Sequence, residues 1–140
     1  MNNVKYNAEL KVLVVDDMMT MRKILSQQLR TMGFNHVHEA VDGIAAWDAL
    51  EKAAAEKKPF DIVVSDWNMP NMKGIDLLKK CRNNVIYKTV AFLIVTAEAE
   101  ISQVKEAVVA GVDNYVVKPF TPASFTEKFN LVYEKRFGSK

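Results

Sequence analysis

The chain has 140 residues, of which 49% are hydrophobic and 26% are charged, and its net charge at pH 7 is +2. This length suits one domain, and the composition is ordinary for a soluble globular protein. The small, well-mixed charge argues against a nucleic-acid-binding protein or a protein held at a membrane surface. The single cysteine, Cys81, has no partner for an internal disulfide, which is typical of reducing compartments.

Neither end of the chain resembles a targeting or membrane segment. The longest strongly apolar run, residues 90–95, falls far short of the ~20 residues that a membrane helix needs, and the first residues lack the apolar core of a signal peptide. We therefore expect a cytoplasmic protein. Residues 1–8 are expected to form a loose lead-in to one domain that spans residues 9–137.

Four short apolar runs predict buried β-strands: VLVV at 12–15, IVV at 62–64, FLIV at 92–95 and YVV at 115–117. Unbroken apolar runs of this length suit strands that are covered on both faces, as in a parallel sheet. The segment HVHEA at 36–40 alternates in polarity, which predicts a fifth strand at an edge of the sheet.

Helical patterns follow each of these strands. Apolar residues recur at helical spacing from Met21 to Met32, and Gly33 follows as a C-cap. The last helix is expected to begin after Thr121, which can cap it, with Pro122 in the first position. Three further helices are predicted at 44–57, 73–82 and 102–110.

Strand and helix thus alternate five times along the chain. Parallel strands joined by right-handed helical crossovers form a doubly wound sheet. We expect the α/β class: a single (βα)5 domain with a five-stranded parallel sheet in the flavodoxin-like strand order 2-1-3-4-5.

Polar side chains follow four of these strands where each one ends. Asp16 and Asp17 follow the first run, Asp66 the third strand, Thr96 the fourth and Lys118 the fifth. Ligand sites of open α/β sheets lie beyond the carboxyl ends of the strands. The five side chains are therefore expected to meet at one edge of the molecule.

A set of three carboxylates, one hydroxyl and one amine suggests phosphoryl chemistry. Close carboxylates repel each other by about 4 kcal/mol at an effective dielectric constant of ~20, and a hard cation relieves that repulsion. Oxygen ligands favour Mg²⁺ or Mn²⁺ over zinc. A carboxylate beside Mg²⁺ can attack phosphorus and form an aspartyl phosphate, with Lys118 and Thr96 placed to receive the phosphoryl oxygens.

Each of these residues also has an ordinary structural explanation. Asp16 and Asp17 could cap the first helix, and Thr96 could cap the fourth. Lys118 could be a solvated surface charge, and Asp66 a turn residue ahead of a proline. A shared site is favoured over these separate explanations, because all of them would have to apply at the same time at four different strand ends.

The strand ends carry four motifs: VLVVDD, VSDWNMPNM, IVTAEA and YVVKPF. In this order, over residues 10 to about 135, they resemble the receiver domain of two-component response regulators. Within that family they are most similar to the single-domain regulators of chemotaxis. The resemblance implies a phosphorylatable signalling switch rather than an enzyme, one that assists its own phosphorylation and dephosphorylation.

The resemblance also implies a role for each motif residue. Asp66 would accept a phosphoryl group from a histidine kinase. Asp17 would bind Mg²⁺ directly, Asp16 largely through water, and Asn68 through its backbone carbonyl. Lys118 would contact the phosphoryl group.

Further positions would carry the response to phosphorylation. Thr96 would move toward the phosphoryl group and vacate space into which the ring of Tyr115 turns. Glu98 and Asn68 would tune dephosphorylation. The peptide bond before Pro119 lies where the family often has a cis peptide.

The output surface implied by the resemblance consists of the fourth helix, the fifth strand and the fifth helix, with Ala99, Ile101, Val104, Tyr115, Val117 and Lys128. A histidine kinase of the CheA type is the expected phosphodonor, and the flagellar motor switch protein or another output protein the expected target. A phosphatase is a further candidate partner. We expect no nucleic acid, no membrane and a monomer. The chain departs from the chemotaxis branch at Glu100–Ile101, at Lys73 and in a longer second helix and loop, AAAEKKPFD. The departures on the partner surface bear on the output partner and not on the phosphorylation chemistry.

Other functions compete with the motor-directed switch. A stand-alone receiver could serve as a phosphate sink or a relay to a partner other than the motor. A small metal-dependent phosphatase could also form an aspartyl phosphate, but such enzymes often place an acid–base aspartate where this chain has Asn68. A nucleotide or flavin binder is disfavoured because no glycine-rich phosphate loop is present.

Trp67, His36 and His38 have no role in the proposed chemistry, but the sequence predicts how each is placed. Trp67, beside the acceptor, is expected to be partly exposed, so that its fluorescence could report metal or phosphoryl binding. His36 and His38 would project from the same face of the edge strand, where ordinary surface histidines are favoured over a metal-binding pair.

Overall fold

The computed structural model describes residues 4–97 and 101–138, in which five strands alternate with five helices. The strands are β1 (Lys11–Val15), β2 (His36–Ala40), β3 (Ile62–Asp66), β4 (Ala91–Thr96) and β5 (Asn114–Val117). The helices are α1 (Met19–Met32), α2 (Gly43–Ala55), α3 (Gly74–Arg82), α4 (Ile101–Ala110) and α5 (Pro122–Phe137).

The five strands form one parallel sheet in the order β2-β1-β3-β4-β5. This order confirms the predicted flavodoxin-like topology, and β2 lies at an edge as its alternating sequence indicated. Every residue of β3 and β4 is buried, as expected for central strands covered on both faces.

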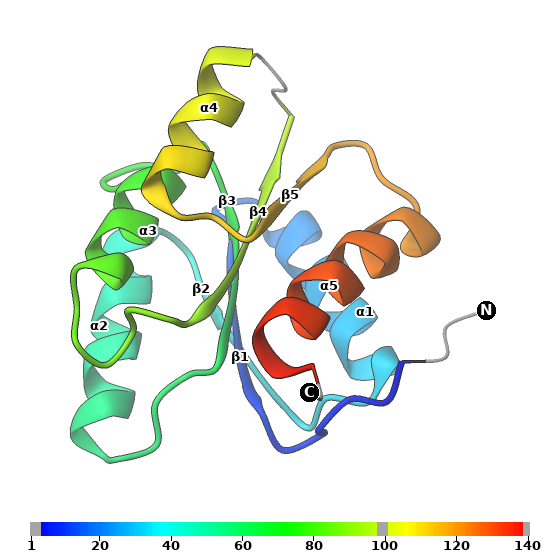
Figure 1. Cartoon of the computed structure of the whole chain (residues 1–140), viewed down its shortest axis with the longest axis horizontal. Coiled ribbons are helices and arrows are strands. Elements are labelled where there is room, and N and C mark those ends of the chain that lie inside the picture. The colour runs from blue at the N-terminus through cyan, green and yellow to red at the C-terminus, as the bar shows by residue number, and fades with distance from the viewer. Residues whose placement is uncertain (1–3, 98–100, 139–140) are drawn as a thin grey trace.

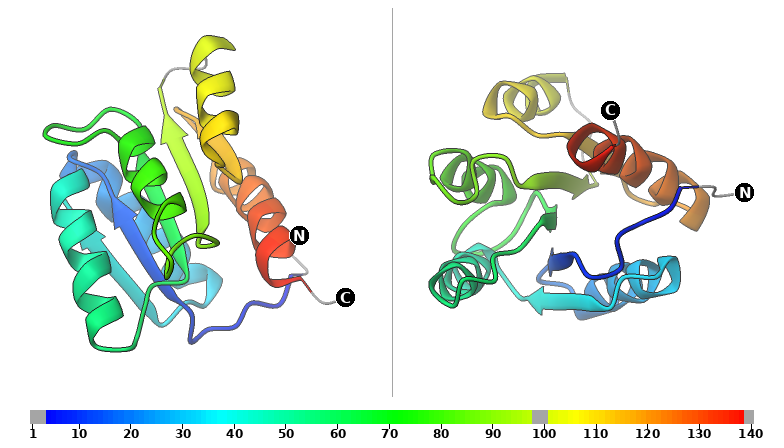
Figure 2. Two further views of the ribbon diagram at one scale, coloured as in Figure 1. Left: turned by 60° about the vertical axis from the view of Figure 1, so that its left-hand side comes forward. Right: turned by 60° about the horizontal axis from the view of Figure 1, so that its bottom comes forward.

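Helices cover both faces of the sheet, giving three layers (Figure 1). Helices α2, α3 and α4 pack on one face around a core that includes Leu50, Leu77 and Phe92. Helices α1 and α5 pack on the other face, where Leu25 and Phe129 are buried. Figure 2 shows the same sandwich from two further directions.

Local chemistry explains where the helices begin and end. Gly33 has a φ of 114°, a left-handed conformation that favours glycine, and its N–H bonds to the carbonyl of Arg30 at the end of α1. Thr121 caps α5 by accepting from the Ser124 N–H at 3.0 Å, and the Ser124 hydroxyl accepts from the Thr121 N–H at 3.0 Å. Both caps were predicted from the sequence.

The segment that precedes β1 differs from its expectation. Residues 4–8 are not a loose lead-in, because the ring of Tyr6 lies 5.1 Å from Phe34 and 5.1 Å from Tyr133, between ring centroids. The Tyr6 hydroxyl donates to Asn130, and the Asn7 N–H donates to the Tyr133 hydroxyl at 2.8 Å. An aromatic side chain near the N-terminus therefore ties this segment to α5.

The register of the sheet positions the functional residues. Asp66 at the end of β3 pairs with Val95, and Thr96 at the end of β4 pairs with Val117. Parallel neighbours end at the same edge, so Asp66, Thr96 and the residues that follow β1 and β5 converge there. Among the described residues, no helix is both long and apolar enough to cross a membrane.

Candidate functional site: an acidic pocket at the strand ends

The carboxyl edge of the sheet brings together the five side chains that the sequence singled out. Carboxylate oxygens of Asp16, Asp17 and Asp66 all lie within 4.8 Å of one another. The Lys118 Nζ lies 3.3 Å from Asp16 Oδ2 and 3.5 Å from Asp66 Oδ1. Thr96 is buried at the end of the adjacent strand, β4.

Asp66 occupies the centre of this arrangement. Its side chain is 10% exposed, and its Oδ1 accepts a hydrogen bond from the Trp67 N–H at 2.8 Å. Burial raises the pKa of Asp66 above its ordinary value; Lys118 opposes this rise, and the charge of Asp16 adds to it. The carboxylate is thus accessible over a small area only and is held at a cost in electrostatic energy.

Asp16 is held from several sides at once. Its side chain is fully buried, and its Oδ1 accepts from the Met18 N–H at 2.8 Å. Its backbone carbonyl accepts from Arg22 Nη1 at 2.8 Å. These contacts direct the second carboxylate oxygen toward Lys118, so the orientation of Asp16 is fixed before any ligand binds.

The ordinary explanations for Asp16, Asp17 and Lys118 do not fit the geometry. Helix α1 has Met18 as its N-cap, with no side-chain capping bond, so neither Asp16 nor Asp17 caps it. Lys118 is 17% exposed and contacts two carboxylates, unlike a solvated surface charge.

The acidic cluster is suited to a hard divalent cation. It offers carboxylate oxygens from three residues, one of which, Asp17, is exposed and gives access from solvent. Oxygen ligands alone favour Mg²⁺, which keeps part of its hydration shell when few protein groups bind it. One lysine cannot neutralise three carboxylates, so the pocket carries a net negative charge that a cation would relieve.

The backbone of the loop between β3 and α3 packs closely against the end of β3. A Cβ atom added at Gly74 would lie only 2.1 Å from the backbone oxygen of Asp66, so this position requires glycine. The Gly74 N–H bonds to the carbonyl of Trp67 at 2.9 Å. Asn68 is exposed in the same loop.

A side-chain hydrogen bond from Asn71 to Asp42 also anchors this loop, to the start of α2. Asn71 has a φ of 72°, and its Nδ2 donates to Asp42 Oδ2 at 2.9 Å. Asp42 also caps α2 through the Ala45 N–H, and these hydrogen bonds lower the pKa of Asp42 below its ordinary value. The sequence reasoning missed this pair, whose only signal was the turn-forming character of both residues.

Trp67 differs from its expectation. It is 4% exposed rather than partly exposed, and it belongs to the core that α2, α3 and α4 cover. Its ring lines a small cavity together with Thr96 and Tyr115. We still expect its fluorescence to report changes at Asp66, because its own N–H donates to the Asp66 carboxylate.

The residues of the implied output surface are placed in part. Tyr115 and Val104 are half-buried and Val117 is 39% exposed, while Lys128 Nζ lies 5.5 Å from the centroid of the Tyr115 ring. Glu98, Ala99 and Glu100 lie outside the described residues, as does the side chain of Ile101. Two valines that the sequence reasoning did not single out, Val108 and Val109, are exposed on α4.

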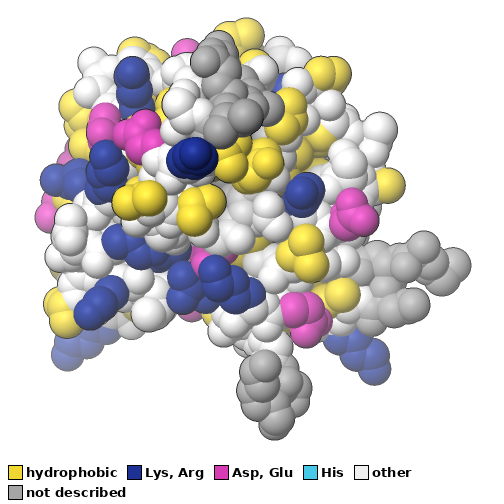
Figure 3. Space-filling model, turned by 45° about the horizontal axis from the view of Figure 1, so that its top comes forward, with side chains coloured by type: hydrophobic (Ala, Val, Ile, Leu, Met, Phe, Trp, Pro, Cys, Tyr) yellow, Lys and Arg dark blue, Asp and Glu magenta, His cyan; other side chains and the backbone are white. Residues whose placement is uncertain are grey.

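The surface around the pocket is chemically mixed. Figure 3 turns the upper end of the molecule toward the viewer, where lysine and arginine, acidic and apolar side chains are interspersed. The peptide bond between Lys118 and Pro119 is cis, as expected. His36 binds Glu9 at 2.8 Å, which agrees with an ordinary surface histidine, and His38 is exposed.

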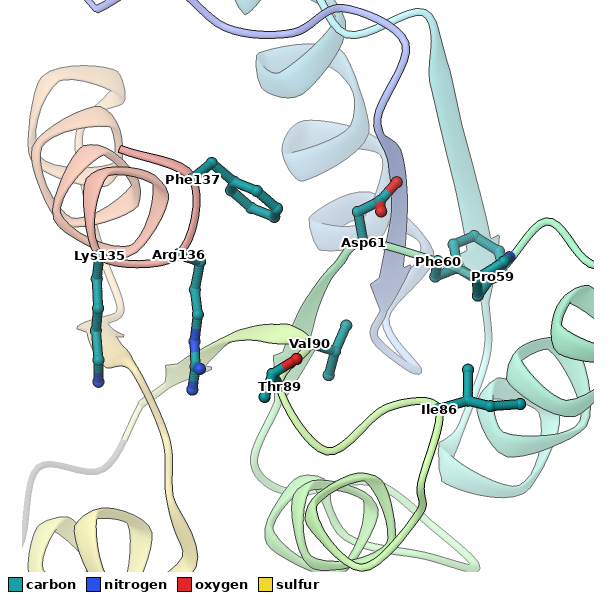
Figure 4. A pocket seen from close by; sticks show the side chains of 9 residues that line it. All are labelled: Pro59, Phe60, Asp61, Ile86, Thr89, Val90, Lys135, Arg136 and Phe137. Atoms are coloured by element: carbon teal, nitrogen blue, oxygen red, sulfur yellow. The ribbon is translucent and has the colours of Figure 1, made fainter. Parts of the chain in front are cut away.

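A second hollow, of about 320 Å³, lies at the opposite end of the strands (Figure 4). Lys135 and Arg136 line it from α5, and Asp61, just before β3, lines another part of its wall. Both cations bind the buried carboxylate of Asp113, at 3.0 Å and 2.8 Å. These charges therefore stabilise the fold, and the hollow is separate from the acidic pocket.

Comparisons with known proteins agree with the geometry. Residues 12–130 match the response regulator receiver domain family. The chain is 47% identical to chemotaxis protein CheY-3 of Vibrio cholerae over 129 residues, which cover 92% of this chain and 95% of that protein. It is 42% identical to CheY1 of Helicobacter pylori over 123 residues, covering 88% and 96% of the two chains.

Solved structures give the same assignment. The structure of Vibrio cholerae CheY4 has a TM-score of 0.78 and 35% identity, covering 89% of this chain and 99% of that one. CheY in a CheX-CheY-BeF3-Mg+2 complex from Borrelia burgdorferi has a TM-score of 0.77 and 29% identity, covering 89% of each chain. The chain therefore belongs to the response regulator receiver domain family, and its highly similar relatives are chemotaxis proteins of the CheY type.

Proposed function

We propose that this protein is the phospho-accepting switch of a chemotaxis phosphorelay, with residues 9–137 as its receiver domain. One observation carries the proposal: the nearly buried carboxylate of Asp66 lies with Asp16 and Asp17 within 4.8 Å and has Lys118 at 3.5 Å. This set combines a nucleophile, a cation site and a fixed positive charge at one strand end. Relatives of the CheY type support the chemotaxis assignment.

Asp16, Asp17, Asp66 and the backbone carbonyl of Asn68 would hold Mg²⁺, or Mn²⁺ in its place. When bound, the ion supplies positive charge that neutralises the carboxylates and the oxygens of an incoming phosphoryl group. The protein itself supplies the orientation, because Asp16 and Asp66 are already fixed by hydrogen bonds from the Met18 and Trp67 N–H groups.

Phosphorylation is a displacement at phosphorus. A carboxylate oxygen of Asp66 forms the new P–O bond while the P–N bond of a phosphohistidine on the kinase breaks, and the imidazole leaves with the electron pair. Lys118 balances charge on the transferred oxygens, and Thr96 donates its hydroxyl to one of them. Hydrolysis reverses the state: water attacks phosphorus, the bond to Asp66 breaks, and inorganic phosphate departs. Asn68 and Glu98 would set the rate of that step.

The signal would leave the site through Thr96 and Tyr115. Thr96 moves toward the phosphoryl group, which opens space behind it, and the ring of Tyr115 turns into that space. Both residues line one cavity between β4, β5 and α4. New charge at Asp66 thus shifts an equilibrium between two packings, which is the physical form of such a switch.

The output surface would be formed by α4, β5 and α5, with Ala99, Ile101, Val104, Tyr115, Val117 and Lys128. We place a CheA-like histidine kinase upstream, and the flagellar motor switch protein or another output protein downstream, all in the cytoplasm. The exposed Val108 and Val109 add apolar area to α4, on which a partner protein could dock. We expect the protein to act as a monomer.

A small-molecule phosphodonor tests the proposal. With acetyl phosphate and Mg²⁺, intact-mass spectrometry should find one phosphoryl group per chain, lost again on a scale of seconds to minutes, and no addition to Asp66→Asn. Asp61→Asn, which changes a carboxylate far from the pocket, is the control and should be phosphorylated normally. Rapid multiple turnover of a phosphomonoester would instead favour a phosphatase.

A further inference from the structure

A small cavity lies between the end of β4, β5 and helix α4. Trp67, Ile94, Thr96, Gln103, Val104, Ala107 and Tyr115 line it. Its volume of about 10 Å³ is about that of a single water-sized sphere, so it cannot admit a phenol ring unless a neighbour moves. The surface exposed to the cavity is apolar, although three of the residues around it, Thr96, Gln103 and Tyr115, carry polar groups.

Gln103 has an unusual environment for a glutamine. Its Oε1 atom is buried and has no hydrogen-bond partner in the described part of the chain. Buried polar atoms in native proteins nearly always have partners, and each exception calls for a specific explanation. An amide oxygen without a donor raises the free energy of the conformation that contains it.

A suitable donor lies on the wall of the same cavity. The ring of Tyr115 is half-buried beside Lys128, and within residues 4–97 and 101–138 its hydroxyl forms no hydrogen bond. A phenol can donate to an amide oxygen or accept from an amide nitrogen, so the pair can bond whichever way the Gln103 amide is turned. The Tyr115 hydroxyl can therefore supply the hydrogen-bond partner that the buried Gln103 oxygen lacks.

We propose that Gln103 is a positioning residue of the switch: it receives the Tyr115 hydroxyl when the ring turns into the cavity. The inference rests on the proposed function, because the ring can enter only after Thr96 has moved toward a phosphoryl group on Asp66. The unsatisfied amide destabilises the resting packing, and the new bond stabilises the active one. Gln103 thus narrows the free-energy gap that phosphorylation must overcome.

This role makes a prediction that ordinary packing does not make. Methionine has nearly the shape of glutamine but neither donates nor accepts a strong hydrogen bond. Gln103→Met should leave the melting temperature of the resting protein unchanged or higher, because a buried unsatisfied oxygen is removed. The same variant should respond less to activation. Gln27→Met, the same change at an exposed position of α1, is the control.

The test is a double-mutant cycle with beryllium fluoride and Mg²⁺, which together stand in for the phosphoryl group. Half-saturation is measured by tryptophan fluorescence for the wild type, Gln103→Met, Tyr115→Phe and the double variant. Each single change should weaken binding about 2- to 10-fold, the effect of one hydrogen bond, and the double variant should be no weaker than either. Fluorotyrosine ¹⁹F NMR, with Tyr115→Phe assigning the resonance, reports how far the ring turns inward.

The outcomes separate the inference from the proposed function. If the wild type does not bind beryllium fluoride at Asp66, the proposed function fails and the inference with it. If it binds and the Tyr115 resonance shifts, two results would overturn the inference alone. One is that Gln103→Met binds beryllium fluoride as tightly as the wild type. The other is that the double variant loses affinity by the product of the two single effects, which would show that the two residues act independently. A lower melting temperature of Gln103→Met would likewise show a structural role and overturn it.

Discussion

Replacing Lys118 by methionine tests the electrostatics of the acidic pocket. The ammonium lies 3.3 Å from Asp16 and 3.5 Å from Asp66, and its side chain is only 17% exposed. At an effective dielectric constant of ~20, each contact corresponds to about 5 kcal/mol of gross Coulomb energy. The desolvation of the lysine offsets much of this, and removal of one partner of a buried pair generally costs about 3–5 kcal/mol.

We expect Lys118→Met to lower the free energy of unfolding by about 3 kcal/mol without metal, the low end of that range, since Asp17 faces solvent. Urea denaturation followed by far-UV circular dichroism measures the change. Lys79→Met is the control, because Lys79 and Glu106 form an ion pair in which each side chain is 49% exposed, worth at most ~1 kcal/mol.

Mg²⁺ and pH should both modulate the loss. Saturating Mg²⁺ should narrow the gap between variant and wild type, because the ion supplies the positive charge that the variant lacks. Burial already raises the pKa of Asp66, and removing Lys118 removes a group that lowers it. A carboxyl with a raised folded-state pKa is stabilised by protonation, so the variant should regain stability relative to wild type as the pH falls through that pKa. A gap that is absent, or that Mg²⁺ leaves unchanged, would refute the reasoning.

Two further predictions concern the supports of the site. Gly74→Ala places a Cβ 2.1 Å from the Asp66 backbone oxygen, so it should lower stability by about 1–3 kcal/mol and slow phosphoryl uptake from acetyl phosphate; unchanged values of both would contradict the close approach. Asp113→Asn should lower the free energy of unfolding by about 3–5 kcal/mol at neutral pH. The change leaves Arg82, Lys135 and Arg136 without their buried carboxylate partner. Burial alone would raise the pKa of Asp113, but hydrogen bonds from Arg136, the Phe92 N–H and Lys135 outweigh it and lower the pKa. Its contribution is thus lost as the pH falls through the lowered pKa, and urea denaturation at several pH values should show the gap closing in acid.

The sequence was sufficient for the fold and for the centre of the site because both follow from periodicity. Apolar runs of strand length alternate with helical patterns, and parallel strands bring their carboxyl ends to one edge. Asp16, Asp66, Thr96 and Lys118 therefore had to converge once the strands were correctly placed. Helix ends were predicted equally well where glycine, threonine or proline marked them.

The features that the sequence did not reveal depend on contacts between distant segments. Trp67 follows a strand end, where a side chain can point either way, and its burial depends on packing in the core that α2, α3 and α4 cover. Tyr6 lies in a polar N-terminal segment, and its partners are distant in sequence: Phe34 before β2, and Asn130 and Tyr133 on α5. Gln103 is a polar residue on a surface helix, and its buried amide oxygen belongs to a side chain that lines a cavity with Trp67 and Tyr115 from other elements. No periodic pattern within a single element carries that information.

Locating the phosphoryl group tests the central claim most directly. After a brief reaction with acetyl phosphate and Mg²⁺, borohydride reduces an aspartyl phosphate to homoserine, and peptide mass mapping identifies the modified residue. Homoserine should appear at Asp66 alone, with Asp16 and Asp17 unmodified and no reaction when Mg²⁺ is chelated. Homoserine at Asp16 or Asp17, or full modification without a divalent cation, would contradict the assignment of acceptor and metal ligands.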